Sequence, residues 1–448
     1  MTKEIKNKKV TVLGAARSGI AAAKLLKAMG AEVFVSDYSK KDLIPDLEKY
    51  GIDYESGMHS SRVFEADFVT LSPGISQKTE IVKEIKAKNI PVFSEIEVAS
   101  WFCKSPVIGV TGSNGKTTTT TLIGEMLKKK YDDAIVAGNI GQPFSSFVQN
   151  SREDSMAVVE LSSFQLETID TFAPRTVVVL NFAPNHLDWY AAYEDYKEAK
   201  WRITKNLKEN DLFIYNADDD DVAKRGLRLN CRKQSFSVKE AKKTDAYYAD
   251  GKLWLYGKKL IDVDEMQIRG LHNNMNALAA SLAAADAGVE TLQIAQTLRE
   301  FEGVEHRLEF VKDINGVKYY NDSKATTVES LWYALKSFSA PIVLIAGGKD
   351  KGSDFSKLNE LISERVKEVV LIGNAAQKME KTWRAIKPLT IAASLNDAVN
   401  RAAAIAHNGD VILLSPACAS FDMFNDFEDR GRQFKEIVNK LAEKNEIG

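Results

Sequence analysis

The chain has 448 residues, more than one hydrophobic core can serve, because single cores stop growing near about 250–300 residues. Hydrophobic residues make up 44% of the sequence and charged residues 27%, as is usual for a soluble globular protein. Lys and Arg total 60 against 62 Asp and Glu, for a net charge of -2. The basic excess of a nucleic-acid-binding protein is missing, so we expect no nucleic-acid partner.

The apolar runs and the cysteines indicate in which cellular compartment the protein is expected. No apolar run reaches the ~18 residues of a membrane-spanning helix, and Met1–Lys6 is not an apolar signal segment. The 3 cysteines, Cys103, Cys231 and Cys418, lie far apart and lack metal-ligand spacing. Few unpaired cysteines favour a reducing compartment. We therefore expect a cytoplasmic protein that does not insert into membranes and acts as a monomer.

Short apolar runs alternate with helical patterns along most of the chain, which is typical of parallel sheets flanked by helices. In the first run the predicted strands are Lys9–Leu13, Glu32–Ser36, Ala66–Leu71 and Pro91–Phe93. A glycine-rich turn and a helix ending at Met29 separate the first two strands. The fold class is α/β, and residues 1–95 are predicted to form a Rossmann-like N-terminal domain.

Two more runs follow the first. The second has predicted strands at Pro106–Val110, Ala134–Ala137, Met156–Leu161, Thr176–Leu180 and Asp211–Tyr215, a helix from Lys116, a hairpin of Ala246–Ala249 with Leu253–Tyr256, and helices at Asn274–Ala287 and Thr291–Glu300. The third has strands at Ile342–Ala346, Glu368–Ile372, Leu389–Ala392 and Val411–Leu414. We predict a central mononucleotide-binding domain at 96–301 and a Rossmann-like C-terminal domain at 302–448.

A phosphate-binding loop is the most specific motif of the sequence. It lies between a predicted strand and a predicted helix and has the form Gly-Ser-Asn-Gly-Lys-Thr-Thr. Glycines let backbone N–H groups turn inward, the helix N-terminus adds positive charge, Lys116 reaches the terminal phosphates and Thr117 can bind Mg²⁺. Val110 stands where the usual, longer loop has its first glycine. A plain helix-capping turn is the alternative to an ATP site. The predicted ATP contacts are Gly112, Ser113, Asn114, Gly115, Lys116, Thr117 and Thr118.

Lys200 lies on the apolar face of a predicted helix, Tyr193–Leu207. Positions 193, 196, 200, 203 and 207 share that face, and the other four residues are Tyr, Tyr, Ile and Leu. Burial lowers the pKa of a lysine and makes its amine nucleophilic. The alternative is a buried stem whose ammonium group reaches the solvent.

Two further side chains suit a metal site. Glu160 belongs to the end of a predicted strand, where a carboxylate lies beside the loop of the neighbouring strand and can bind Mg²⁺. A glutamate pointing into solvent is the alternative. His186 follows the next predicted strand, and taken alone it is more typical of a hydrogen-bonded surface histidine than of a ligand.

Polar loops flank the central run on both sides. The turn Gly14-Ala-Ala-Arg-Ser-Gly19, with Asp37 after the next strand, indicates a nucleotide site, although Ala16 breaks the dinucleotide pattern Gly-x-Gly-x-x-Gly. Arg17 and Asp37 as solvated loop charges are the alternative. Near the C-terminus the loops 322–327, 347–352 and 414–420 are expected to converge on one crevice at the carboxyl ends of parallel strands.

The sequence resembles the Mur ligase family of peptidoglycan synthesis, to which folylpolyglutamate synthetase is related. The matching strings are Ser72-Pro-Gly-Ile75, Thr111-Gly-Ser-Asn-Gly-Lys-Thr-Thr118, Gly138-Asn-Ile-Gly141, Glu160-Leu-Ser-Ser-Phe-Gln-Leu166, Asn185-His-Leu-Asp188, His272-Asn273 with Asn276, His306-Arg307, Asp322-Ser-Lys-Ala-Thr326 and Leu414-Ser-Pro-Ala-Cys-Ala-Ser420. They span almost the whole chain. The first and the last two are similar to the branch that joins D-glutamate to UDP-N-acetylmuramoyl-L-alanine, so the resemblance implies an ATP-dependent amide ligase with these two substrates.

The resemblance also implies a role for each matching residue. The implied cofactors are ATP, two Mg²⁺ ions and a carbamate formed from CO₂ on Lys200. The implied catalytic residues are Lys116, Lys200, His186 and Lys324, and the implied Mg²⁺ ligands are Thr117, Glu160, His186 and Lys200. Further implied ATP contacts are Asn273, Asn276, Arg307 and Asp322. The UDP substrate is assigned to Arg17, Ser18, Asp37, Ser72, Gly74 and Asn139, and D-glutamate to Thr326, Lys351, Ser420 and Phe427. Asn185 stands where many relatives have Asp.

Other classes of protein explain only part of these features. A P-loop switch or transport ATPase shares the phosphate loop but needs no convergent polar loops after residue 301. A nicotinamide-dependent oxidoreductase accounts for the N-terminal turn alone. Within the ligases, folylpolyglutamate synthetase is the alternative, distinguished by its folate substrate.

Overall fold

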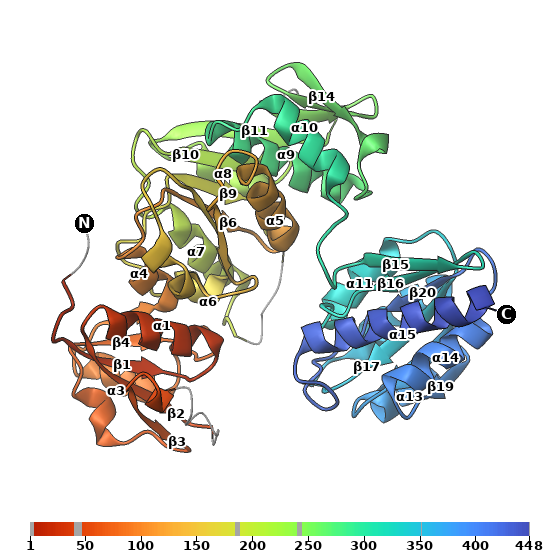
Figure 1. Ribbon diagram of the computed structural model, residues 1–448, viewed down its shortest axis with the longest axis horizontal. Coiled ribbons are helices and arrows are strands. Elements are labelled where there is room, and N and C mark those ends of the chain that lie inside the picture. Colours follow the sequence, from red (N-terminus) through yellow and green to blue (C-terminus); the bar gives the residue numbers. More distant parts are fainter. Residues whose placement is uncertain (1–3, 40–46, 184–188, 240–243, 351, 448) are drawn as a thin grey trace. The chain divides into compact units, whose positions relative to one another are not determined.

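The computed structural model describes residues 4–39, 47–183, 189–239, 244–350 and 352–447. The chain divides into two compact units, Met1–Phe301 and Glu302–Gly448. The first unit contains a five-stranded and a nine-stranded sheet, and the second a six-stranded sheet (Figure 1). The predicted α/β fold with three sheets is confirmed. No helix within the described ranges is long and apolar enough to cross a membrane. The domain boundary near residue 95 stays a prediction.

The five-stranded sheet is parallel throughout, with the order β3-β2-β1-β4-β5. Its strands are β1 (Lys9–Leu13), β2 (Glu32–Asp37), β3 (Asp53–Ser56), β4 (Phe68–Leu71) and β5 (Val92–Ser94), and its helices are α1 (Arg17–Ala28), α3 (Glu80–Ala87) and α4 (Glu95–Ser100). The chain leaves β1 toward β2 on one side and returns through β4 on the other. Since ligands bind where the strand order reverses, the loops after β1 and β4 are the expected place for a binding site in this sheet.

The nine-stranded sheet has the order β14-β13-β12-β11-β10-β9-β6-β8-β7. Its strands are β6 (Val107–Thr111), β7 (Ile135–Gly138), β8 (Ala157–Glu160), β9 (Thr176–Val179), β10 (Leu212–Asn216), β11 (Arg232–Ser237), β12 (Ala246–Ala249), β13 (Lys252–Leu255) and β14 (Lys258–Asp262). Strands β12 to β14 form an antiparallel meander, and the others are parallel. Every residue of β6, β8 and β9 is buried, because their apolar runs are covered on both faces.

The helices of this part are α5 (Lys116–Leu127), α6 (Ser163–Leu166), α7 (Tyr193–Trp201), α8 (Asp220–Gly226), α9 (Leu271–Asp286) and α10 (Thr291–Glu300). Figure 1 shows α5 beside α9. The predicted helix Tyr193–Leu207 is too long, since α7 ends at Trp201 and the chain tightens into a 3₁₀ turn at Arg202–Thr204. The side chain of Arg202 donates to the carbonyl oxygens of Leu166 and Ile169 there, and the turn buries Ile203 completely.

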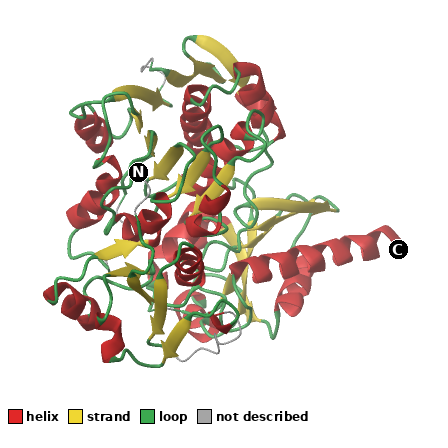
Figure 2. Cartoon of the chain, turned by 60° about the vertical axis from the view of Figure 1, so that its left-hand side comes forward, coloured by secondary structure: helices red, strands yellow, loops and turns green. Residues whose placement is uncertain are grey.

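The second unit has the strand order β15-β16-β20-β17-β18-β19. Its strands are β15 (Glu309–Ile314), β16 (Val317–Asn321), β17 (Ile342–Gly347), β18 (Val366–Ile372), β19 (Leu389–Ile391) and β20 (Val411–Leu414), and its helices are α11 (Val328–Lys336), α12 (Asn359–Arg365), α13 (Ala376–Trp383), α14 (Leu395–Ile405) and α15 (Phe427–Ile447). Only β15 is antiparallel, and its pairing with β16 shifts register between Phe310 and Lys312. Figure 2 shows α15 as a long helix that ends at the C-terminus.

Candidate active site

The phosphate loop connects β6 to α5, as predicted. Gly115 has φ 81°, and a Cβ atom there would lie 2.2 Å from Oδ1 of Asn276, so only glycine fits. Lys116 begins α5, and its Nζ donates to the carbonyl oxygens of Gly112 and Ser113, both at 2.9 Å. The lysine is thus folded over its own loop, which places its charge where phosphates are bound in such loops.

Side chains from α9 lie against this loop. Asn276 accepts a hydrogen bond from Oγ1 of Thr119 at 3.3 Å and donates to Oδ1 of Asn273 at 3.1 Å. Thr117 and Thr118 are buried in the first turn of α5. The sequence-predicted residues Asn273, Asn276, Thr117 and Thr118 therefore gather around one loop.

Glu160, at the end of β8, is 2% exposed, so the solvent-facing alternative is wrong. Its Oε1 accepts a hydrogen bond from Nδ2 of Asn139 at 3.0 Å. Its Oε2 is buried and, among the described residues, has no hydrogen-bond partner. A buried carboxylate oxygen without a donor is suited to a cation, and Mg²⁺ prefers such oxygen ligands. Asn139, predicted to contact the UDP substrate, lies here beside Glu160.

Lys200 is 2% exposed, so the alternative in which its ammonium group reaches solvent is wrong. Its Nζ lies over the ring of Tyr196, 4.9 Å from the centroid. Burial, assisted by the positive charge of Lys116, lowers the pKa of Lys200 well below its usual range, and the charge of Glu160 opposes this only in part. The amine is therefore held toward its neutral, nucleophilic form. The predicted ligand His186 lies outside the described residues.

The N-terminal crevice is held by two hydrogen bonds. Asp37, at the end of β2, accepts from the backbone N–H of Ala15 at 2.7 Å, and Ser72, after β4, donates to the carbonyl oxygen of Gly14 at 2.9 Å. Asp37 is 6% exposed, so the reading of it as a solvated charge is wrong. Arg17 is exposed at the start of α1, followed by Ser18, and Gly74 is exposed in the loop after β4.

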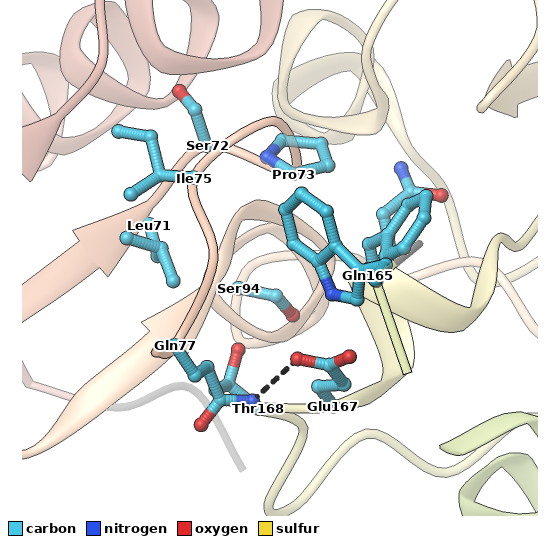
Figure 3. A pocket seen from close by; sticks show the side chains of 11 residues that line it. Leu71, Ser72, Pro73, Ile75, Gln77, Ser94, Gln165, Glu167 and Thr168 are labelled. Atoms are coloured by element: carbon cyan, nitrogen blue, oxygen red, sulfur yellow. Dashed lines mark hydrogen bonds between the residues drawn. The ribbon is translucent and has the colours of Figure 1, made fainter. Parts of the chain in front are cut away.

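A narrow slot with a volume of about 10 Å³ lies next to Ser72. Leu71, Pro73 and Ile75 line one part of it, and Gln165 and Trp189 line another. Figure 3 shows Pro73 and Gln165 among the lining residues, and the hydrogen bond from Nε2 of Gln77 to Oε2 of Glu167, which is 2.7 Å long. Gln165 lies in one of the matching strings but was not predicted as a site residue, because nothing in its spacing sets it apart from a helix residue.

The three polar loops of the second unit leave three adjacent strands, β16, β20 and β17. The N–H of Asp322 donates to the carbonyl oxygen of Leu414, and the hydroxyl of Ser415 donates to Oδ2 of Asp322, both at 2.7 Å. The N–H of Gly347 donates to the carbonyl oxygen of Pro416 at 2.9 Å. Burial raises the pKa of Asp322 to about 7, although Ser415 and the nearby charge of Arg307 favour the ionised form.

Arg430 fastens these loops and was not predicted from the sequence. It is completely buried on α15. Its Nε donates to the hydroxyl of Ser323 at 2.9 Å, and one terminal nitrogen donates to the carbonyl oxygen of Ser323 at 2.8 Å and to that of Cys418 at 3.2 Å. The hydroxyl of Ser323 donates in turn to the carbonyl oxygen of Phe427. Burial lowers the pKa of Arg430 to about 10.

The remaining predicted residues of this unit lie on or near these loops. The Nζ of Lys324 lies 5.8 Å from the ring centroid of Phe427, and the N–H of Lys324 donates to the carbonyl oxygen of His306. Ser420 is buried, and Thr326 is partly exposed. The predicted D-glutamate contact Lys351 lies outside the described residues.

The described phosphate loop is typical of nucleotide-binding proteins, and the family models identify the family. The Mur ligase middle domain matches residues 110–284, the Mur ligase glutamate ligase domain matches residues 306–418, and the MurD N-terminal domain matches residues 9–81. The chain belongs to the Mur ligase family, whose members are ATP-dependent ligases. The predicted family and enzyme class are confirmed.

Individual relatives are similar over nearly the full length. The UDP-N-acetylmuramoylalanine--D-glutamate ligase of Chloroherpeton thalassium is 44% identical over 467 residues, which cover 98% of this chain and 99% of the relative. The enzyme of the same name from Salinibacter ruber is 42% identical, with the same coverage. Among solved structures, the UDP-N-acetylmuramate-alanine ligase MurC of Thermotoga maritima matches with a TM-score of 0.62 at 20% identity, covering 97% of this chain and 100% of that one. This last match supports the fold.

Proposed function

We propose that the chain adds D-glutamate to UDP-N-acetylmuramoyl-L-alanine with ATP, in the cytoplasm, as a step of peptidoglycan synthesis. The observation that carries this proposal is the full-length similarity, at 44% and 42% identity, to two enzymes named for that reaction. The phosphate loop at Lys116 and the buried pair of Glu160 and Lys200 supply the ATP-using chemistry that the reaction needs.

The substrate carboxylate attacks the γ-phosphorus of ATP, and ADP leaves. The amine of D-glutamate then attacks the carbonyl carbon of the resulting acyl phosphate, and inorganic phosphate leaves from the tetrahedral intermediate. The first step gathers negative charge on the phosphate oxygens. The second gathers it on the former carbonyl oxygen, and the attacking amine loses a proton before phosphate leaves, so no enzyme nucleophile is needed. We assign neutralisation of this charge to Lys116 and Lys324, so catalysis consists of positioning and electrostatic stabilisation.

We propose that this site also holds two Mg²⁺ ions. The proposed ligands are Thr117, Glu160, His186 and a carbamate on Lys200. Two observations support this assignment. Oε2 of Glu160 is buried and has no hydrogen-bond partner in the described part of the chain, so it can serve as an oxygen ligand. The lowered pKa of Lys200 favours the neutral amine, which adds CO₂ with loss of a proton. Mg²⁺ bound there would neutralise charge on the transferring phosphate.

The other substrates are assigned to the flanking crevices. Arg17, Ser18, Asp37, Ser72 and Gly74 would bind the uridine diphosphate, with Asn139 contributing from the residue just after β7. Thr326, Lys351, Ser420 and Phe427 would bind D-glutamate. Arg307 and Asp322 would complete the contacts of the nucleotide.

The test is phosphate release from ATP with the purified full chain. UDP-N-acetylmuramoyl-L-alanine is supplied together with each of a panel of D- and L-amino acids, and folate with L-glutamate serves as the comparison for folylpolyglutamate synthetase. We expect release only with the UDP substrate and D-glutamate. Release in the absence of any amino acid would indicate an ATPase instead, and release with folate would indicate the second ligase.

A further inference from the structure

The segment 181–183, which follows β9, runs alongside the phosphate loop. The N–H of Leu180 donates to the carbonyl oxygen of Thr111 at 3.1 Å, and the N–H of Ser113 donates to the carbonyl oxygen of Asn181 at 2.9 Å. The pairing of β9 with β6 therefore continues past the end of both strands and into the loop.

Two side chains extend this pairing in opposite directions. Oδ1 of Asn181 accepts from the N–H of Asn114 at 2.9 Å, and Nδ2 of Asn181 donates to the carbonyl oxygen of Asn114 at 3.2 Å. In return, the hydroxyl of Ser113 accepts from the N–H of Ala183 at 2.8 Å and donates to its carbonyl oxygen at 3.0 Å. Each side chain thus binds both backbone groups of a residue on the other segment. We call these four hydrogen bonds the clasp.

The clasp uses the full capacity of the Ser113 hydroxyl. A hydroxyl has one proton to donate and two lone pairs. Its proton goes to Ala183, and its lone pairs accept from the N–H of Ala183 and from the hydroxyl of Tyr196, which lies 3.1 Å away. The Ser113 hydroxyl is therefore committed to protein partners, and none of its capacity remains for a phosphate oxygen.

We infer that Ser113 and Asn181 are positioning residues, which hold the phosphate loop in its ATP-binding shape before the nucleotide arrives. The inference rests on the proposed function and deepens it. The loop lacks the first glycine of the longer form, at Val110, and the clasp supplies from a neighbouring strand the support that the shorter loop does not make for itself. A loop that is already ordered loses less conformational entropy on binding, which raises affinity.

The test compares equilibrium binding of ADP, measured by calorimetry on the full chain, with thermal unfolding. Asn181→Ala removes two hydrogen bonds of the clasp and Ser113→Ala removes the other two, and we expect each change to weaken ADP binding about 10-fold or more. Ser113→Thr keeps the hydroxyl and should restore most of the affinity. Thr176→Val is the matched control, because it removes the bond of 3.0 Å from Thr176 to Asp286 at the opposite end of β9. It should lower the unfolding temperature as much and leave ADP binding within about twofold.

The double variant provides the second measurement. If the two halves form one clasp, removing both should weaken binding little more than the larger single change, because either loss opens the same structure. Losses that multiply, or an Asn181→Ala protein that binds ADP as well as the wild type, would overturn the inference. A wild-type chain that binds no ADP would overturn both the clasp and the proposed function, which distinguishes the two failures.

Discussion

Two regions of the protein differ in how they stabilise buried charge. The first crevice is the region around the phosphate loop, with Glu160 and Lys200, and the second is formed by the three polar loops after β16, β17 and β20. In the first, Oε2 of Glu160 is buried without a partner among the described residues, and the pKa of Lys200 is lowered. In the second, the buried guanidinium of Arg430 donates to Ser323 and to Cys418. Buried charge is stable only when it is matched. The first crevice therefore leaves an oxygen of Glu160 unmatched by any described group, whereas the second uses Arg430 to hold its loops together.

The largest effect is expected in the first crevice, from Lys116→Ala. The change removes positive charge from the transferring phosphate and leaves the core intact, so phosphate release should fall about 10³-fold or more. Circular dichroism should report an unchanged fold. Lys128→Ala is the matched control, because Lys128 follows the same helix and its ion pair with Glu125 is exposed to solvent. Turnover near the wild-type rate in a folded Lys116→Ala protein would remove the loop from the mechanism.

Substitutions of Lys200 can distinguish a role in binding CO₂ and Mg²⁺ from a purely structural role. Lys200→Ala should be inactive, and formate or acetate should restore part of the turnover by occupying the vacated anion position. Lys200→Arg should stay inactive, since arginine remains protonated and cannot add CO₂.

Lys200→Met should also be inactive and should stabilise the first unit by about 1–3 kcal/mol in denaturant unfolding, because it removes a buried amine without opening a cavity. A fully active Lys200→Arg protein would show that the residue is structural, and a destabilised Lys200→Met protein would show that the amine is already matched.

In the second unit the pH dependence of stability should be large and of the opposite sign to that of an ion-paired carboxylate. The pKa of Asp322 rises from 3.8 to about 7 on folding, so the folded chain holds a proton that the unfolded chain releases between these values. The contribution of Asp322 to the free energy of unfolding should therefore be greatest below about pH 4. It should fall by about 3–4 kcal/mol as the pH rises to 7. Urea unfolding of Asp322→Asn should lose this slope. An unchanged slope would mean that Asp322 is ionised throughout.

The smallest effect concerns Arg430. Arg430→Met keeps the apolar stem but leaves the carbonyl oxygens of Ser323 and Cys418 without their donor, so the second unit should lose about 2–3 kcal/mol in urea unfolding. Arg401→Met is the control, since Arg401 forms an exposed pair with Asp397 on α14 and should contribute little. Equal stabilities of the two variants would contradict the role of Arg430 as the fastener of these loops.

The two crevices also differ in how far their buried residues could be predicted from the sequence. Lys200 was predicted to be buried because Tyr196 and Ile203 share its face, and this held although the helix ends earlier than predicted. The spacing of apolar residues along one helix is enough to predict that Lys200 is buried. The partners of Arg430 lie 107 and 12 residues away in the chain, and no spacing rule connects them.

The strands that were not predicted have a related explanation. The sheet members missed were β3, β11, β14, β15 and β16, whose sequences are rich in polar residues. Strand β16 is short and mixes Lys318 and Asn321 with apolar residues, so it is a strand because it pairs with β15 on one side and with β20 on the other. The clasp was missed for the same reason, because Asn181 and Ser113 gain their role from two segments that meet only in the fold.

The edges of the six-stranded sheet have a consequence for how the protein behaves at high concentration. An unpaired strand edge is a template for other chains, and a regular one promotes aggregation. Here one edge is β15, whose register shift between Phe310 and Lys312 interrupts the even row of backbone groups, and the other is β19, which has only three residues. Neither edge offers a long, flat partner for a second sheet. One edge is thus protected from pairing with another sheet by an irregularity and the other by its short length, and neither feature involves the polar loops at the carboxyl ends of the strands.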